Sequence, residues 1–270
     1  MAPPPSLKLL WVNPVNTTTY DQAFADVIKE MKLPNAEVHV VSLKLPSHIT
    51  LTNLEYRAFE SVIWWPVTHI AHYAAENGFD GYAIACFYDT ALDEAREVSG
   101  SAVVSAPCEA SLKIVSSLCN RFSVVIGVDK WKVQMEDRIR HYGYGNKLAS
   151  FRSTGLHVDE FQKDPKKTEE AIRQAIKLAI MEDRAEAIIL GCTIEFGFYD
   201  LLQNEFKIPI IDASVACYKD VEYAALLNKQ FGWKPSRIQS GEAAKKDEIE
   251  RSGIYNGEVP IGNRIVIKMD

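Results

Sequence analysis

The sequence predicts an α/β protein of two similar lobes, each a parallel sheet flanked by helices, with the active site in the cleft between them. Three observations lead to this prediction. Short apolar runs rich in Val and Ile alternate with helical patterns, the alternation occurs twice, and each copy carries a cysteine at the end of a strand. Strands that alternate with helices form right-handed βαβ units, and such units build parallel sheets.

The predicted strands are short and mostly apolar throughout, as expected when helices cover both faces of a sheet. They lie at residues 7–13, 37–43, 81–86, 102–105, 122–127, 147–152, 187–191 and 208–211. The tail at 241–270 differs in composition, and we assign it no chemistry. A final apolar run at 265–268 predicts an edge strand or a segment that packs on a neighbour.

Two helix starts carry local signals. Residues 52–55 (Thr-Asn-Leu-Glu) resemble a capping box and predict a helix running towards Asn77, with Pro66 kinking or dividing it. Asp164 followed by Pro165 predicts an N-cap with proline at the first helical position. The next stretch then places apolar residues on one face, at positions 171, 172, 175, 176 and 179.

An internal repeat divides the chain. Residues 80–86 and 186–192 each form an apolar run that ends in a cysteine, Cys86 and Cys192. A helix-like segment and a second apolar strand follow each run at nearly the same spacing. We therefore predict lobe 1 at residues 1–115 plus 218–270, and lobe 2 at 116–217. Ligands bind at the carboxyl ends of strands in open parallel sheets, so two facing lobes would bring both thiols to one cleft.

Composition excludes several classes of function. The formal net charge is −6 and no Lys/Arg cluster is present, so we expect no nucleic-acid partner. No apolar stretch approaches the length of a membrane span, and the first residues do not resemble a signal peptide, so we expect no membrane partner. The five cysteines include no Cys-x-x-Cys pair, which favours reduced thiols and a cytoplasmic setting.

Paired thiols suit the inversion of a carbon acid, which needs a base on one face and an acid on the other. A thiolate at Cys86 or Cys192 and a thiol at the other would exchange these roles, with no metal or other cofactor. A helix beginning close behind each cysteine would favour the thiolate. Backbone N–H groups and the Thr193 hydroxyl would stabilise the developing enolate. The remaining thiols, Cys108, Cys119 and Cys217, fit buried helical positions.

Two weaker signals have ordinary explanations. His69, His72 and Glu76 would share one helix face, as metal ligands do, but no fourth ligand is evident and a solvated or interfacial face fits better, so we predict no metal. Aromatic residues at 196, 198 and 199 would line a pocket wall or belong to the core.

An ordered set of motifs resembles hydantoin racemases of the aspartate/glutamate/hydantoin racemase superfamily. The matching segments are 13–18 (Asn-Pro-Val-Asn-Thr-Thr), 85–89 (Ala-Cys-Phe-Tyr-Asp), 109–110 (Glu-Ala), 190–193 (Leu-Gly-Cys-Thr) and 209–212 (Pro-Ile-Ile-Asp). The resemblance implies a small-molecule substrate, cofactor-independent inversion of an activated Cα–H, Cys86 and Cys192 as acid and base, and assembly into a homo-oligomer.

The resemblance also implies substrate contacts from the first loop, at Asn13, Asn16 and Thr17. Val15 interrupts the family's Asn-Pro-Asn, so either asparagine would supply the polar contact. Glu109 and Thr193 are further candidates. Phe87 and Tyr88 stand where amino-acid racemases of the superfamily have Asn-Thr, which favours a less charged substrate such as a hydantoin or allantoin.

Two alternatives remain open at this stage. The residues after each cysteine depart from the family, at Asp89-Thr90-Ala91 and at residues 193–195 (Thr-Ile-Glu). These changes keep open a decarboxylase or isomerase of the same superfamily that acts through an enolate, although the second cysteine argues against it. A non-catalytic small-molecule binding protein built on the same lobes is the other alternative.

Overall fold

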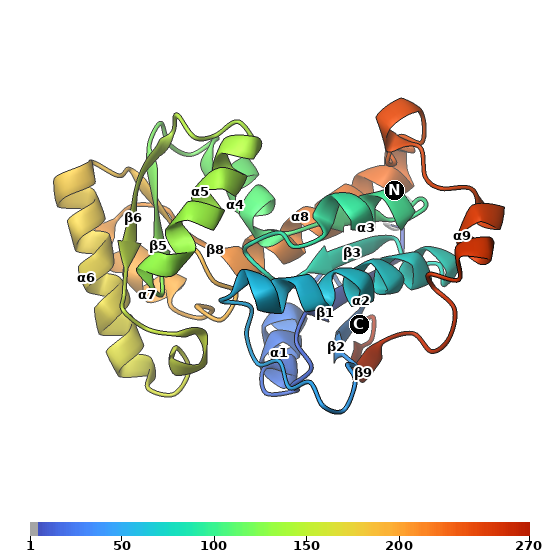
Figure 1. The fold of residues 1–270 in the computed structure, drawn as a ribbon. Coiled ribbons are helices and arrows are strands. Elements are labelled where there is room, and N and C mark those ends of the chain that lie inside the picture. The colour runs from blue at the N-terminus through green and yellow to red at the C-terminus, as the bar shows by residue number, and fades with distance from the viewer. Residues whose placement is uncertain (1–4) are drawn as a thin grey trace. The chain divides into compact units, whose positions relative to one another are not determined.

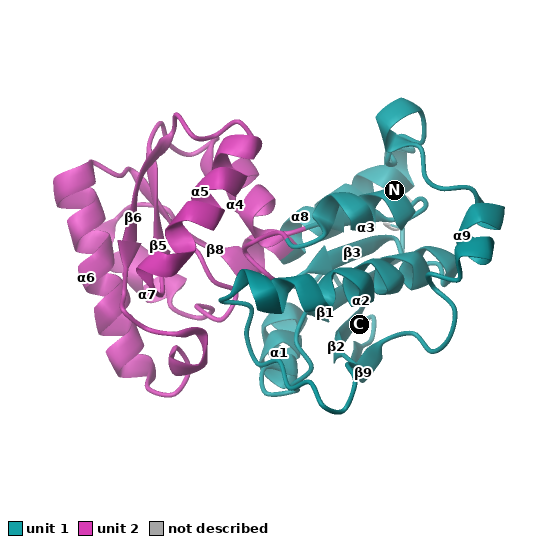
Figure 2. Ribbon diagram, viewed as in Figure 1, with its two compact units in different colours: residues 1–85, 90–105, 218–270 teal, residues 86–89, 106–217 magenta. Residues whose placement is uncertain are grey.

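The computed structural model describes residues 5–270, which fall into two compact units (Figure 2). Unit 1 holds residues 5–85, 90–105 and 218–270. Unit 2 holds Cys86–Asp89 and Ala106–Cys217. The chain therefore passes between the units after Ala85, Asp89, Ser105 and Cys217, and both candidate catalytic cysteines belong to unit 2.

Unit 1 is built on a five-stranded sheet in the order β4-β3-β1-β2-β9. Its parallel strands are β1 (Leu7–Asn13), β2 (Ala36–Leu43), β3 (Gly81–Ile84) and β4 (Val103–Ser105). The helices are α1 (Asp21–Met31), α2 (Arg57–Glu76), α3 (Leu92–Val98), most of α8 (Ala213–Phe231) and α9 (Lys246–Ser252). Helices lie on both sides of the sheet (Figure 1), which explains why its strands are apolar on both faces.

Unit 2 has a four-stranded parallel sheet in the order β6-β5-β7-β8. The strands are β5 (Phe122–Ile126), β6 (Leu148–Ser153), β7 (Ala187–Leu190) and β8 (Ile210–Asp212). The helices are α4 (Pro107–Val115), α5 (Lys132–His141), α6 (Pro165–Asp183) and α7 (Tyr199–Phe206). Short 3-10 turns at Asp129–Trp131 and Val158–Glu160 complete the connections.

The two sheets repeat one topology. Read from the strand that follows the cysteine loop, the orders are β4-β3-β1-β2 and β8-β7-β5-β6. Strands β1, β2, β3 and β4 of unit 1 therefore correspond to β5, β6, β7 and β8 of unit 2. This confirms the predicted α/β class with two similar lobes. Each sheet also contains a switch point, β1/β3 or β5/β7, where successive connections diverge and ligands characteristically bind.

Helix α6 behaves as its sequence predicts. The Asp164 carboxylate accepts a hydrogen bond from the Lys167 N–H at 3.1 Å, and Pro165 occupies the first turn. The apolar face is buried against β7 and α7, in a cluster that includes Ile172, Ile176 and Leu202. The capping residue and the apolar face therefore both favour the same helix, and a helix that is favoured in both ways can be predicted from the local sequence.

Helix α2 departs from its prediction in two ways. It begins at Arg57, after Tyr56 with no side-chain cap, because Asn53 turns its carbonyl oxygen to the Glu55 N–H and holds residues 53–55 outside the helix. The predicted start at Thr52 was therefore wrong. Pro66 is buried inside a continuous helix, so it does not divide the helix. Burial of its neighbours Ile63, Val67 and Ile70 offsets the backbone hydrogen bond that proline cannot make.

The tail completes unit 1. β9 (Ile261–Ile267) pairs antiparallel with β2, which confirms the predicted edge strand and lengthens it. Between α9 and β9, Tyr255 stacks on His69 and His72 of α2, and the Ile254 carbonyl accepts a hydrogen bond from the Trp65 indole N–H at 2.6 Å. The paired histidines therefore form an aromatic contact with the tail. No described helix is long and apolar enough to span a bilayer.

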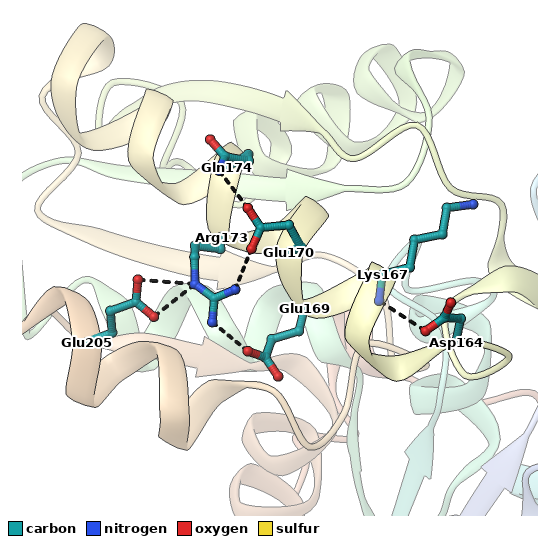
Figure 3. A network of polar contacts seen from close by, with 7 residues as sticks. All are labelled: Asp164, Lys167, Glu169, Glu170, Arg173, Gln174 and Glu205. Atoms are coloured by element: carbon teal, nitrogen blue, oxygen red, sulfur yellow. Dashed lines mark hydrogen bonds and ion pairs between the residues drawn. The ribbon is translucent and has the colours of Figure 1, made fainter.

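A carboxylate network ties α6 to α7 (Figure 3). The Arg173 guanidinium donates to Glu205 of α7 at 2.9 Å, to Glu170 at 2.7 Å and to Glu169, while Glu170 also accepts from Gln174. The Arg173 side chain is only 24% exposed. Water therefore screens these ion pairs less than it screens pairs on an open surface.

We expect Arg173→Ala to lower the free energy of unfolding by about 1 kcal/mol, near the upper end for partly exposed ion pairs, with a smaller loss at high salt. Urea unfolding at two salt concentrations measures both effects. Arg140→Ala is the matched control. The Arg140 side chain is 68% exposed and pairs with Glu136 within α5, so its removal should leave the urea midpoint almost unchanged. Equal losses in the two variants would contradict this assignment.

Candidate active site

Cys86 lies just beyond β3, at the switch point of the first sheet. β1 and β3 are neighbours in the sheet. Ala85 is the first residue after β3, and its N–H donates to the Val12 carbonyl of β1 at 2.9 Å. Asn13 ends β1 and Cys86 follows Ala85. The Cys86 residue is half-buried.

Cys192 occupies the equivalent place in the second sheet. Gly191 follows β7, and its N–H donates to the Val125 carbonyl at 2.7 Å, which repeats the Ala85–Val12 bond. Cys192 is also half-buried. A Cβ on Gly191 would lie 2.7 Å from Val124 Cγ1 and 2.9 Å from the Val125 oxygen, so only glycine lets the chain approach β5 this closely.

The other thiols have different surroundings. Cys108 and Cys217 are fully buried, and burial raises the pKa of the Cys108 thiol well above its usual value. Cys119 lies in a turn after α4, outside the predicted helical position, and its thiol contacts the Val115 carbonyl. Cys86 and Cys192 are thus distinguished by their matched strand-end positions, since Cys119 is also half-buried.

Neither cysteine is followed at once by a helix, contrary to the sequence prediction. After Cys86 a turn leads to α3 at Leu92, and after Cys192 a longer loop leads to α7 at Tyr199. The field of a helix N-terminus falls off within its first turn. The dipoles of α3 and α7 therefore do not account for thiolate formation at these positions.

The first-strand loop belongs to unit 1, where Asp21 and the loop at 49–51 hold it. The Asn13 amide donates to the buried Asp21 carboxylate at 2.9 Å. Asn16 uses both ends of its side chain, donating to the Ile49 carbonyl at 2.8 Å and accepting from the Leu51 N–H at 2.6 Å. Thr17 is half-buried. Both asparagines therefore use their side chains within unit 1, and Asn13, at 4% exposure, is the more deeply buried of the two.

The aromatic candidates fall into two groups. Phe87 and Tyr88, directly after Cys86, are buried in unit 2, and the Tyr88 carbonyl accepts a hydrogen bond from the Arg138 guanidinium at 3.1 Å. Phe198 and Tyr199 pack into the core cluster beneath α6. Of the two alternatives left open for Phe198 and Tyr199, the structure favours the core.

The two further candidates for substrate contacts, Glu109 and Thr193, lie at the start of α4 and in the Cys192 loop. Glu109 is in the first turn of α4 and forms an ion pair with Lys113 at 3.1 Å. Thr193 is buried directly after Cys192, and its carbonyl accepts a hydrogen bond from the Ser214 hydroxyl at 2.8 Å. The Ser214 bond connects the Cys192 loop to α8, whereas the Glu109–Lys113 pair lies within α4.

Three buried carboxyl groups that lie in the cysteine loops or bond to them were not predicted as site residues from the sequence. Asp212 accepts from the Ser214 N–H at 2.8 Å and the Gly197 N–H at 3.3 Å, which joins the Cys192 loop to the start of α8. Asp89 and Glu195 are completely buried. Burial raises the pKa of Asp89 to about 7, that of Asp212 to about 6 and that of Glu195 well above its usual value. The available signal was an acid three positions after each cysteine.

These raised pKa values predict that the protein is less stable at pH 8 than at pH 5. The folded state holds protons on Asp89, Asp212 and Glu195 that the unfolded chain releases above about pH 4, so unfolding becomes easier as pH rises through 4 to 7. We expect a loss of about 2 kcal/mol or more, since one pKa unit corresponds to about 1.4 kcal/mol.

Urea unfolding between pH 5 and pH 8 measures this loss. His39 and His69 act against it, because burial lowers their pKa values and favours the folded state as pH rises. Asp212→Asn removes one of the three acidic titrations and should flatten the pH dependence. A midpoint that increases towards pH 8 would contradict the prediction.

No group of three or more His, Cys, Asp or Glu side chains within residues 5–270 is arranged to hold a metal ion. The carboxyl groups of Asp89, Glu195 and Asp212 instead accept hydrogen bonds from backbone N–H groups, those of Cys108, Cys192 and Ser214.

The repeated sheets with a cysteine after the third strand of each define a class of two-lobed α/β proteins. Residues 9–220 match the family described as Asp/Glu/Hydantoin racemase, and the chain belongs to that family. A hydantoin racemase of Pseudomonas sp. (strain NS671) is 32% identical over 243 residues, which cover 90% of this chain and 94% of that protein. One from Paenarthrobacter aurescens is 28% identical over 225 residues, covering 83% and 93%.

Solved structures share the fold. An allantoin racemase from Klebsiella pneumoniae superposes with a TM-score of 0.81 at 23% identity, covering 89% of this chain and 95% of that one. The family match ends at residue 220, so β9 and α9 lie outside it. The resemblance drawn from the motifs is thereby confirmed at the level of the family and the fold.

Proposed function

We propose that this protein is a cofactor-independent racemase or epimerase that inverts an activated Cα–H carbon, with Cys86 and Cys192 as its acid and base. One observation carries the proposal. The two cysteines occupy equivalent places after β3 and β7, each preceded by the same backbone hydrogen bond to the neighbouring strand. A repeated thiol suits a reaction that needs the same group on two faces of one carbon.

The proton balance of the proposed reaction is simple. A thiolate takes the proton from the ring carbon, and the electron pair passes into the adjacent carbonyl to give an enolate. The other cysteine, a thiol, then protonates the opposite face. The first cysteine ends as the thiol and the second as the thiolate, which is the arrangement required for the reverse direction. Backbone N–H donors stabilise the charge on the enolate oxygen.

We propose a hydantoin- or allantoin-like substrate. Its ring amides are polar but uncharged, and Phe87 and Tyr88 follow Cys86 where a free amino acid would require charged or strongly polar contacts. The relatives described as hydantoin racemases, at 32% and 28% identity, support the same substrate class. Either Asn13, held by Asp21, or Asn16 supplies the polar contact from the first-strand loop.

Proton NMR in heavy water tests the proposal. Purified protein is added to single enantiomers of several 5-substituted hydantoins and of allantoin, and loss of the Cα proton is followed against an enzyme-free control, with optical rotation recorded in parallel. We expect exchange together with racemisation of at least one of these compounds. Absence of exchange with all of them, combined with release of carbon dioxide from a malonate-type acid, would replace the proposal with a decarboxylase.

A further inference from the structure

Each candidate cysteine opens a tight turn that an acidic residue closes. The Asp89 N–H donates to the Cys86 carbonyl at 2.9 Å, and the Glu195 N–H donates to the Cys192 carbonyl at 3.0 Å. Both acidic side chains are completely buried, at 0% exposure. The two halves of the chain thus repeat a cysteine-x-x-acid turn, although their sequences otherwise differ at these positions.

The Asp89 carboxylate fastens its turn to two helices of unit 2. Its Oδ1 accepts from the Cys108 N–H at 2.8 Å, and its Oδ2 accepts from the Glu109 N–H at 2.9 Å and from the Tyr142 hydroxyl at 2.9 Å. The first two donors are backbone groups that the first turn of α4 cannot satisfy internally. Asp89 therefore caps α4 from a distance, and it holds a left-handed backbone conformation, with φ of 51°, to do so.

Glu195 turns back onto its own cysteine. Its Oε2 accepts from the Cys192 N–H at 3.2 Å, so the carboxyl group fixes the backbone on the amino side of the thiol. Its Oε1 is buried and has no hydrogen-bond partner among the described residues. A buried polar atom without a partner is costly, and the bond to the Cys192 N–H offsets part of that cost.

We propose that Asp89 and Glu195 are a matched pair of positioning residues, one for each cysteine, that hold the two thiols in the geometry required for proton transfer. The inference rests on the proposed function of Cys86 and Cys192 as acid and base. Positioning matters here because misplacing a reacting group by about 1 Å can cost about 10²-fold in rate. Neither acid touches the substrate in this scheme, since both are enclosed by protein.

Replacing the carboxyl group by an amide should have different effects at Asp89 and at Glu195, and this difference gives a test. Three donors converge on Asp89, so Asp89→Asn would turn an N–H₂ group towards a donor. Only the oxygen that faces Cys192 is bonded in Glu195, so Glu195→Gln keeps this acceptor, whereas Glu195→Leu removes it. We expect kcat to fall about 10²-fold in Asp89→Asn and Glu195→Leu, with KM little changed, and Glu195→Gln to stay within about threefold of the parent protein.

A second readout does not depend on catalysis. Folded protein is alkylated briefly with iodoacetamide, and the modification of each cysteine peptide is followed by mass spectrometry. Asp89→Asn should accelerate alkylation of Cys86 by about tenfold and leave that of Cys192 unchanged. Glu195→Leu should accelerate alkylation of Cys192 and leave that of Cys86 unchanged. We expect this because access to a thiol depends on the turn that holds it. The unaffected cysteine is the internal control. If Asp89→Asn does not fold, Tyr142→Phe removes one donor and should shift Cys86 in the same direction.

The outcomes separate the inference from the proposed function. Selective changes in alkylation in a protein that racemises nothing would refute the racemase and leave the positioning roles standing. Equal changes at both cysteines, or none at either, in folded variants would overturn the inference. A Glu195→Gln variant as impaired as Glu195→Leu would overturn the role assigned to the accepted hydrogen bond.

Discussion

Serine in place of Cys86 or Cys192 is expected to abolish inversion while leaving proton exchange on one face of the substrate. In Cys86→Ser, the Cys192 thiolate still removes the proton that it faces, but no thiol stands ready on the other side. The proton, or a deuteron from solvent, then returns from the same side. We expect inversion to fall by about 10² to 10⁴-fold, the usual contribution of a positioned acid or base.

The measurement is deuterium incorporation into each enantiomer separately, followed by NMR. Cys86→Ser should catalyse exchange of one enantiomer and Cys192→Ser exchange of the other. Cys119→Ser is the control, since this thiol is also half-buried but has no counterpart in the repeat. If either cysteine variant exchanged and inverted both enantiomers at the parent rate, the two-thiol mechanism would be wrong.

Alanine at position 191 is expected to damage both activity and stability. The added Cβ would press against the Val124 side chain at 2.7 Å and the Val125 carbonyl oxygen at 2.9 Å, and a backbone oxygen cannot rotate away. Overpacking of this kind costs about 1–3 kcal/mol. The strain falls on the residue next to Cys192, so we expect activity to decrease by about 10²-fold.

Thermal unfolding and kcat together measure the effects of Gly191→Ala. Ala85→Gly changes the equivalent residue of the first half in the opposite direction and makes no clash, so its loss should be limited to backbone entropy, about 1 kcal/mol. A Gly191→Ala protein with parent-like activity would show that the Cys192 loop tolerates displacement. In that case the close approach to β5 would be irrelevant to the proposed chemistry.

The strands were the most predictable part of the fold. Residues 7–13 coincide with β1, and most of the other predicted strands differ from the observed ones by one or two residues at an end. Apolar runs bounded by polar residues determine such strands locally. The exact ends of the strands depend on pairing with their neighbours. For example, Ala83 of β3 pairs with Ser105, the last residue of β4, and β3 itself ends one residue later, at Ile84.

Helix ends and the cysteine loops were harder to predict. A capping signal at Thr52 failed because Asn53 bonds to the Glu55 N–H instead, and Pro66 is tolerated because its surroundings are buried. The repeat located Cys86 and Cys192 from the sequence. The acid three positions after each cysteine marks Asp89 and Glu195 in the sequence, but their roles and that of Asp212 depend on backbone donors that come together only in the folded chain.

The division of the chain has a consequence for its synthesis on the ribosome. The sheet of unit 2 is complete once β8 has been made, whereas the sheet of unit 1 waits for β9, about 50 residues further on. At about 5–20 residues per second, β2 remains an open edge strand for several further seconds after β8 has been made. An unpaired edge is a template for joining another chain. A nascent chain that stalls before residue 261 therefore presents this edge to its neighbours on the same messenger RNA.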